Sequence, residues 1–163
     1  MVLTLIKKSM SHTSHFTMGV DVADLNQDGK LDVFTTDMMP YDSKIFLKSG
    51  GEDLYKISRI KKNLGFEQQF SRNHMQIISG NNTFYDVAIQ TNTHATDWSW
   101  GVLLQDFDSD GKEDIFISNG IIKRPNDLDY INYLSNVDFT EYNNSRQDLI
   151  KKKLIDKMPT LKI

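Results

Sequence analysis

The chain of 163 residues has no cysteine, only three prolines, and four glutamates beside eighteen aspartates. The absence of cysteine excludes disulfide frameworks, thiolate zinc sites and cysteine nucleophiles together. No apolar run approaches the ~20 residues that a membrane helix needs, so the sequence predicts no membrane span. The apolar stretch at residues 1–6 is shorter than the roughly 7 to 15 residues of a signal h-region, and Lys7 and Lys8 follow it rather than precede it, so no signal peptide is visible.

Charge and composition narrow the class of protein further. A formal net charge of -3 and a pI near 5.8 give no basic field, so nucleic acid is not an expected partner. With 39% apolar and 25% charged residues, the chain has the composition of a globular domain with a core. The excess of Asp over Glu is typical of turns, caps and ion-binding loops rather than surface helices.

Two segments of the chain, residues 17–37 and 99–119, are similar to each other at an offset of 82 positions. Eight of the 21 aligned positions are identical, and they fall on glycines, carboxylates and apolar or lysine neighbours. The identities are Gly19/Gly101, Val20/Val102, Asp24/Asp106, Asp28/Asp110, Gly29/Gly111, Lys30/Lys112, Asp32/Asp114 and Phe34/Phe116. Self-similarity of this kind indicates a repeated structural unit.

Each copy consists of an apolar run, an acidic loop with glycine, and a run rich in β-branched and aromatic residues. This pattern predicts a strand, a loop and a second strand. The runs 75–78 and 83–89 flank a turn cluster at 79–82, which predicts another hairpin. We expect the four strands between residues 75 and 122 to form one antiparallel sheet of propeller-blade size.

The segments between and after the two copies have helical periodicity. Glu52 and Asp53 in a first turn, apolar residues at 54, 57, 60 and 64, two late lysines and Gly65 predict a helix over 52–64. Helices are also predicted over 127–137 and over 140–158, where Pro159 ends the pattern. We expect these helices to pack against a sheet; docking of a protein partner by the lysine-rich 140–158 segment is the alternative.

The two acidic loops, residues 24–32 and 106–114, both fit D-x-[DN]-x-D-G-x-x-D. Oxygens at positions 1, 3 and 5 converge when the chain turns at the glycine, and the position 7 carbonyl and the position 9 carboxylate complete the shell. An all-oxygen ligand set favours Ca²⁺ over Mg²⁺ or Mn²⁺. We therefore predict two calcium sites, with the ligands Asp24, Asn26, Asp28, Lys30 (carbonyl), Asp32, Asp106, Asp108, Asp110, Lys112 (carbonyl) and Asp114.

Two other interpretations of these loops stay open. Asp-Gly is a common turn dipeptide, so both loops could be acidic turns without an ion. An EF-hand needs a bidentate Glu at position 12 and helical flanks, whereas position 12 is Thr35 in one copy and Ile117 in the other. The sequence therefore favours a strand-loop-strand site over an EF-hand.

The loops and their flanks resemble FG-GAP or VCBS repeats, the calcium-loop repeats of integrin alpha-chain β-propellers and of many secreted bacterial proteins. Segments 18–40, 71–84 and 96–120 are especially similar to Bacteroidetes-type VCBS proteins, which often carry a C-terminal ASPIC/UnbV domain. The resemblance covers residues 16–122, although residues 79–84 depart from the family's usual Asn-Gly-Asp-Gly-Thr-Phe-like turn. It implies propeller blades with structural Ca²⁺, an extracellular or cell-envelope location, and a role in adhesion.

The resemblance implies a mainly β fold with helical insertions, in which antiparallel four-stranded blades form an incomplete propeller. We expect a partial blade with the first calcium loop at 1–47, a helical insertion at 48–70, a blade with the second loop at 71–122, and a helical segment at 123–163 that leads to a next blade. A closed propeller has 4 to 8 blades. We therefore expect a fragment of a longer protein, with the rest of its own propeller as a partner.

The sequence offers no constellation that predicts catalysis. His12 and His15, at i and i+3, could ligate a metal, but no matched carboxylate cluster accompanies them, so surface or packing roles are expected. There is no G-x-S-x-G motif, and no carboxylate pair is marked outside the loops. Trp98 and Trp100 should share one face of a strand, either as core between blades or as a sugar-stacking platform.

The sequence as a whole predicts a non-enzymatic, calcium-binding segment with an adhesion or glycan- or protein-binding role. Its glycan or protein ligand is not identified by any motif. The alternative is that the segment belongs to a calcium-supported carbohydrate-active enzyme, such as a polysaccharide lyase with a propeller domain.

Overall fold

The structure, a computed structural model, describes residues 9–50, 53–136, 152 and 154–160, and it is mainly β with short helices. The chain divides into two compact units. Unit 1 comprises Met1–Tyr41 and Glu52–Gly120, and unit 2 comprises Asp42–Gly51 and Ile121–Ile163. All the named strands lie in unit 1, so the two acidic loops can be analysed within that unit alone.

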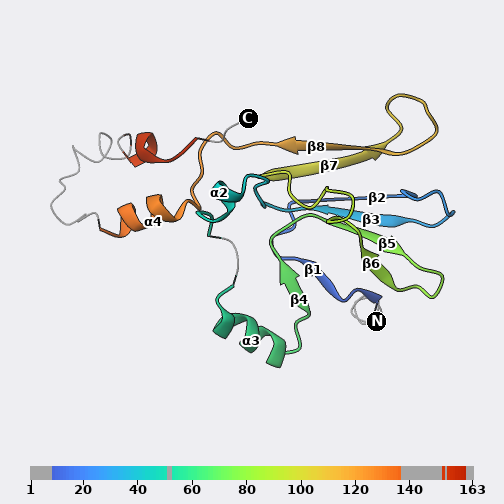
Figure 1. The fold of residues 1–163 in the computed structure, drawn as a ribbon, viewed down its shortest axis with the longest axis horizontal. Coiled ribbons are helices and arrows are strands. Elements are labelled where there is room, and N and C mark those ends of the chain that lie inside the picture. The colour runs from blue at the N-terminus through green and yellow to red at the C-terminus, as the bar shows by residue number, and fades with distance from the viewer. Residues whose placement is uncertain (1–8, 51–52, 137–151, 153, 161–163) are drawn as a thin grey trace. The chain divides into compact units, whose positions relative to one another are not determined.

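Unit 1 contains three sheets, which Figure 1 shows with their connecting loops. The largest has four antiparallel strands in the order β2-β3-β5-β6, a second pairs β7 with β8, and a third pairs β1 with β4 in parallel. The strands are β1 (His12–Ser14), β2 (Gly19–Ala23), β3 (Asp32–Thr36), β4 (Gln68–Phe70), β5 (His74–Ile78), β6 (Phe84–Asp86), β7 (Ser99–Gln105) and β8 (Asp114–Asn119). The three predicted hairpins, β2–β3, β5–β6 and β7–β8, are thereby confirmed.

The expected grouping of these hairpins is wrong. We expected the four strands from 75 to 122 to form one sheet, but β5 and β6 join β3 and β2, while β7 and β8 pair only with each other. The expected boundary at residue 71 therefore falls inside the four-stranded sheet. Hairpins that are adjacent in sequence do not share a sheet here, because β3 pairs with β5 across the long connection 37–73.

The buried side chain of Asn73 explains how that long connection is closed. Its Oδ1 accepts the N–H of Asp37 at 2.8 Å, just after β3. Its Nδ2 donates to the carbonyl of Thr93 at 2.9 Å and to Oγ1 of Thr96 at 2.6 Å, in the segment between β6 and β7. Asn73 is fully buried. Its single side-chain amide therefore links, by hydrogen bonds, the end of β3, the start of β5 and the segment that leads to β7.

The hydrophobic core lies between the four-stranded sheet and the β7–β8 pair. Ala23, Phe34 and Leu104 form its buried cluster, and partly buried side chains from both sheets pack against them: Leu25, Met75, Val102, Ile115 and Ile117. Asp21 Oδ2 on β2 accepts the N–H of Leu104 on β7 at 2.8 Å. The two sheets are therefore joined both by apolar packing and by a hydrogen bond between neighbouring strands.

The helices agree with the predicted periodicity where the structure describes them. The helix expected over 52–64 is α3 (Tyr55–Asn63), which begins later than expected, and Gly65 after it has a φ of 82°, as a C-terminal glycine should. The helix expected over 127–137 is α4 (Leu128–Ser135), and Asp127 caps it by accepting the N–H of Tyr130 at 2.9 Å. Unit 2 also contains α2 (Ser43–Phe46).

Two further expectations have different outcomes. The helix predicted over 140–158 lies largely outside the described residues. Within the described part of the chain, no helix has the length and apolar character required to cross a membrane.

The two tryptophans do not share a strand. Strand β7 begins at Ser99, with an irregularity in pairing between Ser99 and Gly101, so Trp98 precedes the strand. The indole N–H of Trp98 is buried without a hydrogen-bond partner. Trp100 is 45% exposed, and its ring lies against Gly120, where an added Cβ would be 2.3 Å from the indole. The expectation of a common strand face therefore does not apply, because Trp98 lies outside the strand.

Glycine at position 19 is required by the close approach of β2 and β7. A Cβ there would lie 2.9 Å from the Cα of Gly101 and 3.0 Å from the carbonyl oxygen of Trp100, and backbone atoms cannot rotate away. We predict that Gly19→Ala lowers the free energy of unfolding of unit 1 by about 1–3 kcal/mol. Gly80→Ala, where the added Cβ meets nothing within 4 Å, is the matched control and should change it by less than about 0.5 kcal/mol.

Urea unfolding followed by tryptophan fluorescence measures this difference, since both tryptophans lie in unit 1. Equal midpoints for the Gly19→Ala and Gly80→Ala variants would show that β2 and β7 do not approach as described.

Candidate metal-binding loops

The two acidic loops connect strands in the same register. The first joins β2 to β3 after the pair Ala23 and Asp32, and the second joins β7 to β8 after Gln105 and Asp114. Strands on both sides of each loop exclude the EF-hand alternative, which needs helices there. The nine-residue loops therefore begin and end at equivalent points of two hairpins.

The aspartate at the first position organises each loop. Asp24 accepts the N–H of Asp28 at 3.0 Å through one oxygen and the N–H of Gly29 at 2.8 Å through the other. Asp106 makes the same two bonds, to the N–H groups at positions 110 and 111, at 3.1 and 2.9 Å. Both oxygens of a single carboxylate thus hold the chain in its turn, which a side chain without two acceptors could not do.

The third, fifth and ninth positions repeat the same pattern. Oδ1 at position 3 accepts the N–H of position 5 at 3.1 Å in both loops, although the residue is Asn26 in one and Asp108 in the other. Position 5 accepts the N–H of position 7 at 3.0 and 2.9 Å. Position 9 accepts the N–H of position 2 at 3.1 Å in both loops. The two loops therefore share five hydrogen bonds whose lengths agree within 0.1 Å.

The backbone conformation confirms that the loops are equivalent. Positions 4 and 6 have positive φ in each: Gln27 at 58° and Gly29 at 82°, Ser109 at 64° and Gly111 at 85°. A positive φ is unusual for residues other than glycine, so its recurrence at Gln27 and Ser109 reflects a shared constraint. The side-chain acceptors at positions 1, 3 and 5 supply that constraint, because they bond the N–H groups that this backbone turns inward.

The second loop brings three carboxylates together. One oxygen each from Asp106, Asp108 and Asp114 lies within 4.8 Å of the others, a separation that a single cation can bridge. Asp110, which we also predicted as a ligand, is not part of this group. In the first loop Asn26 stands at the position of Asp108, and the residues that the structure describes form no equivalent acidic trio there. The carbonyl roles predicted for Lys30 and Lys112 stay predictions.

The charge of the first loop is partly balanced within the loop. Lys30 Nζ lies 3.0 Å from Asp28 Oδ2. Hydrogen bonding from the Lys30 side chain holds the pKa of Asp28 below its ordinary value. Among the described residues, no Lys or Arg forms an ion pair with a carboxylate of the second loop. The second loop therefore presents the greater uncompensated negative charge.

The ninth position differs in burial between the loops. Asp32 is fully buried, and its second oxygen accepts the N–H of Ile78 on β5 at 2.9 Å. Asp114 is exposed, because β8 has only β7 as a neighbour whereas β3 lies between β2 and β5. Asp32 thus links its loop to the third strand of the sheet.

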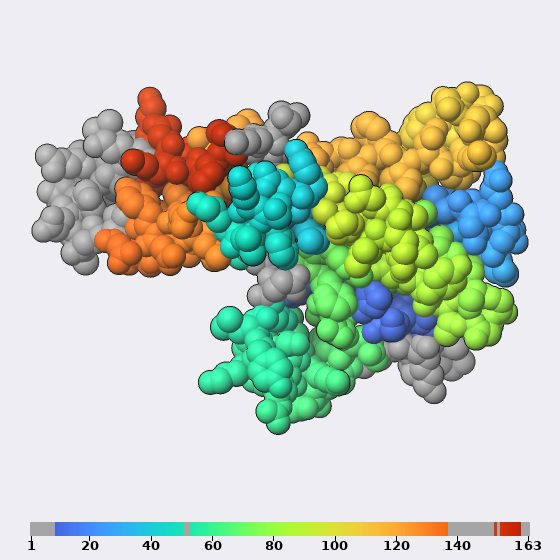
Figure 2. All heavy atoms as spheres, viewed as in Figure 1, coloured from blue at the N-terminus to red at the C-terminus, as the bar shows by residue number. Residues whose placement is uncertain are grey.

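The two loops are neighbours at one end of unit 1. Gln27 Nε2 donates to the carbonyl oxygen of Gly111 at 2.6 Å. Figure 2 shows the first loop (blue) beside the second (gold), both on the surface of the molecule. This accessibility suits sites that take up an ion from solution.

A second group of ionisable side chains lies elsewhere in unit 1, and the sequence did not predict it. His12 does not pair with His15; its Nε2 lies 3.0 Å from Asp86 Oδ2, and Arg72 Nη1 lies 2.7 Å from the same oxygen. His74 lies close to His12 and Asp86. The pKa of His74 is lowered to about 4, mainly because its ring is buried and secondly because of the charge of Arg72. Residues 12, 74 and 86 are far apart in sequence, so no spacing rule could have found them.

Comparisons of this chain with family models, with curated proteins and with solved structures gave no match. The function of the chain must therefore be argued from its own residues and their geometry.

The contrast between Asp32 and Asp114 gives a direct test of the loop geometry. Asp32→Ala removes a fully buried carboxylate and leaves the N–H of Ile78 without this acceptor, so we predict a loss of about 2–3 kcal/mol in the free energy of unfolding of unit 1. Asp114→Ala removes the equivalent carboxylate from an exposed position and should cost about 1 kcal/mol or less. Urea unfolding in EDTA, followed by tryptophan fluorescence, compares the two. Equal losses would contradict the different burial of the two aspartates.

Proposed function

We propose that the chain is a calcium-binding FG-GAP/VCBS repeat segment of a larger β-propeller, in which structural Ca²⁺ ions hold the loops at 24–32 and 106–114. The segment itself is non-enzymatic. It serves adhesion, or the binding of a glycan or protein, outside the cell or in the cell envelope.

The equivalence of the two loops carries this proposal. Five matched hydrogen bonds and two matched positive φ values are maintained in loops that share only five of nine residues. Three carboxylate oxygens within 4.8 Å of one another repel, although backbone N–H groups hold the three side chains in place. A hard divalent cation removes that repulsion, and an all-oxygen ligand set suits Ca²⁺.

The apolar surface of unit 1 supports a place within a propeller. Val102 and Leu104 face the core, whereas Leu103 and its cross-strand partner Phe116 lie on the opposite face and are 45% and 58% exposed. Apolar side chains on both faces of a sheet are typical of a sheet that packs between two others. In a propeller, the next blade covers such a face.

Calcium titration tests the proposal directly. Isothermal titration of EDTA-stripped protein should give two calcium ions per chain and a higher melting temperature. Asp24→Ala and Asp106→Ala should each remove one ion, because each deletes the carboxylate that organises its loop. Asp129→Ala changes the net charge equally but lies in unit 2, and it should leave both ions in place. No heat of binding and an unchanged melting temperature would refute the proposal.

The third position provides a reciprocal test of which loop binds more tightly. The second loop has four aspartates at its ligand positions, and the first has three and Asn26. Ligand charge tunes calcium affinity, so Asn26→Asp should tighten the first site and Asp108→Asn weaken the second, each on the order of tenfold. Both exchanges keep the Oδ1 acceptor in place. Titration calorimetry would contradict this account if both exchanges changed affinity in the same direction.

A further inference from the structure

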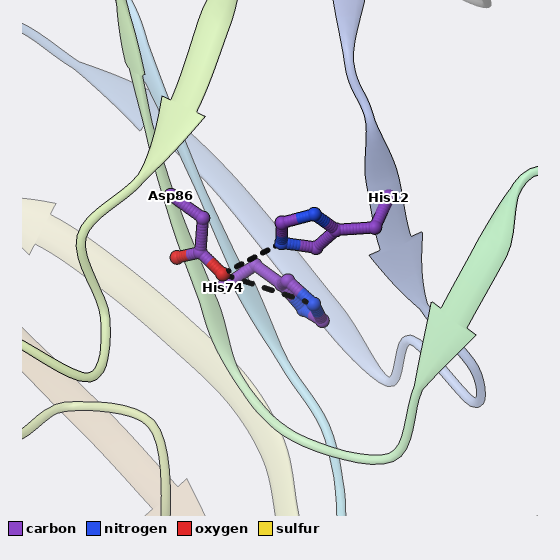
Figure 3. Close-up of side chains that lie close together, drawn as sticks. All are labelled: His12, His74 and Asp86. Atoms are coloured by element: carbon purple, nitrogen blue, oxygen red, sulfur yellow. Dashed lines mark hydrogen bonds and ion pairs between the residues drawn. The ribbon is translucent and has the colours of Figure 1, made fainter.

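Three side chains from three strands of unit 1 converge away from the calcium loops. His12 comes from β1, His74 from β5 and Asp86 from β6, and Figure 3 shows both imidazoles directed at one carboxylate oxygen. His12 Nε2 lies 3.0 Å and His74 Nε2 lies 3.9 Å from Asp86 Oδ2. One ligand atom from each residue lies within 4.8 Å of the other two.

The buried imidazole of His74 has no hydrogen bond of regular geometry at either nitrogen; the groups that act on it are the backbone of Arg72 and the carboxylate of Asp86. The residue is 1% exposed, so bulk water does not reach the ring. A buried polar atom without a partner is costly, and native proteins rarely retain one without a reason. A neutral imidazole keeps one nitrogen lone pair, which is the donor that a metal ion binds.

We propose that His12, His74 and Asp86 form a binding site for a divalent transition-metal ion, with Zn²⁺ as the best match. Two imidazoles and one carboxylate are a ligand set that zinc accepts and that calcium, which takes oxygen ligands, does not. In a tetrahedral zinc site, bonds of about 2.0–2.1 Å place neighbouring ligand atoms about 3.3 Å apart. The observed separations of 3.0 and 3.9 Å lie on either side of that value.

The surroundings orient two of the three ligands, as the outer shell of a metal site does. Oδ1 of Asp86 accepts the backbone N–H groups of Met75 at 3.1 Å and Ala88 at 2.9 Å, which leaves Oδ2 for a cation. Ser11 Oγ lies 3.0 Å from His12 Nδ1, so the opposite nitrogen, Nε2, faces Asp86. Because His12 is 21% exposed at its side chain, an ion can approach from that side.

Arg72 contacts the same group of side chains. Its Nη1 lies 2.7 Å from Asp86 Oδ2, and its Nη2 lies 3.4 Å from His12 Nε2, so the guanidinium contacts two of the three ligand atoms. Metal binding therefore requires Arg72 to move away from Asp86. The arginine competes with the ion, and its removal should increase the affinity for the metal.

Zinc titration of the full chain, with Ca²⁺ in saturating amount to occupy the two loops, tests the site. We expect one zinc ion per chain in the wild type, a loss of affinity of at least tenfold in His74→Gln and in His12→Gln, and a gain of about tenfold in Arg72→Gln. His15→Gln is the matched control, because His15 contacts Lys61 and Asp53 and not this cluster. It should bind zinc as the wild type does.

Substitution of Co²⁺ for zinc adds a spectroscopic signature. The absorption of the bound ion reports its coordination, and it should disappear in His74→Gln and His12→Gln but not in His15→Gln. Should His74→Gln fail to fold by tryptophan fluorescence, the more exposed His12 provides the decisive variant. Absence of zinc binding by the wild type, or binding of equal affinity in His12→Gln, would overturn the proposal.

This site and the calcium loops share no ligand, so the two proposals can fail separately. Loss of calcium binding in Asp24→Ala and Asp106→Ala should leave zinc affinity unchanged. Loss of zinc affinity in those variants would instead show that zinc occupies the acidic loops and would contradict the histidine site.

Discussion

The double acceptor role of Asp24 and Asp106 is the interaction on which the architecture of unit 1 depends. Each carboxylate takes two backbone N–H groups and so forces the reversal that brings two strands into antiparallel register. That register turns Phe34 and Leu104 toward the same core. The same geometry draws carboxylates together, so the interaction that shapes each hairpin also creates a local excess of negative charge. The hairpin geometry and the clustered negative charge therefore have one cause.

Local chemistry explains which features could be predicted from the sequence. The hairpins, α3 and α4 follow from turn residues, periodicity and caps that lie within a few positions of each other. The sheet to which each hairpin belongs does not, because it depends on the buried amide of Asn73, whose partners at 37, 93 and 96 are distant in sequence. The prediction of one sheet over 75–122 failed because neighbouring hairpins were assumed to pair.

The candidate sites differ in the same way. The acidic loops are contiguous, so their spacing alone located Asp106, Asp108 and Asp114 at one centre. The spacing could not show that Asp110 lies outside that group, because the backbone conformation of the loop decides which carboxylate oxygens point inward. The histidine cluster is assembled from three strands, and the sequence offered only the misleading neighbours His12 and His15. Its recognition requires the pairing of β5 with β6 and the approach of β1 to β5, where Gln76 Nε2 donates to the carbonyl oxygen of His12.

Strand β5 connects the two kinds of site through its own backbone. Its last residue, Ile78, donates to Asp32 at the end of the first loop, whereas its first residue, His74, lies in the histidine cluster. Four residues of extended chain separate these ends by about 13 Å. The first loop and the imidazole cluster thus lie at opposite ends of one strand, and each presents ligand atoms that suit a different class of cation. Since Asp86 fixes Oδ1 on the N–H of Met75, the residue after His74, the position of β5 also determines where Oδ2 lies. A shift of β5 toward or away from the first loop would therefore change the separation of the histidine ligands.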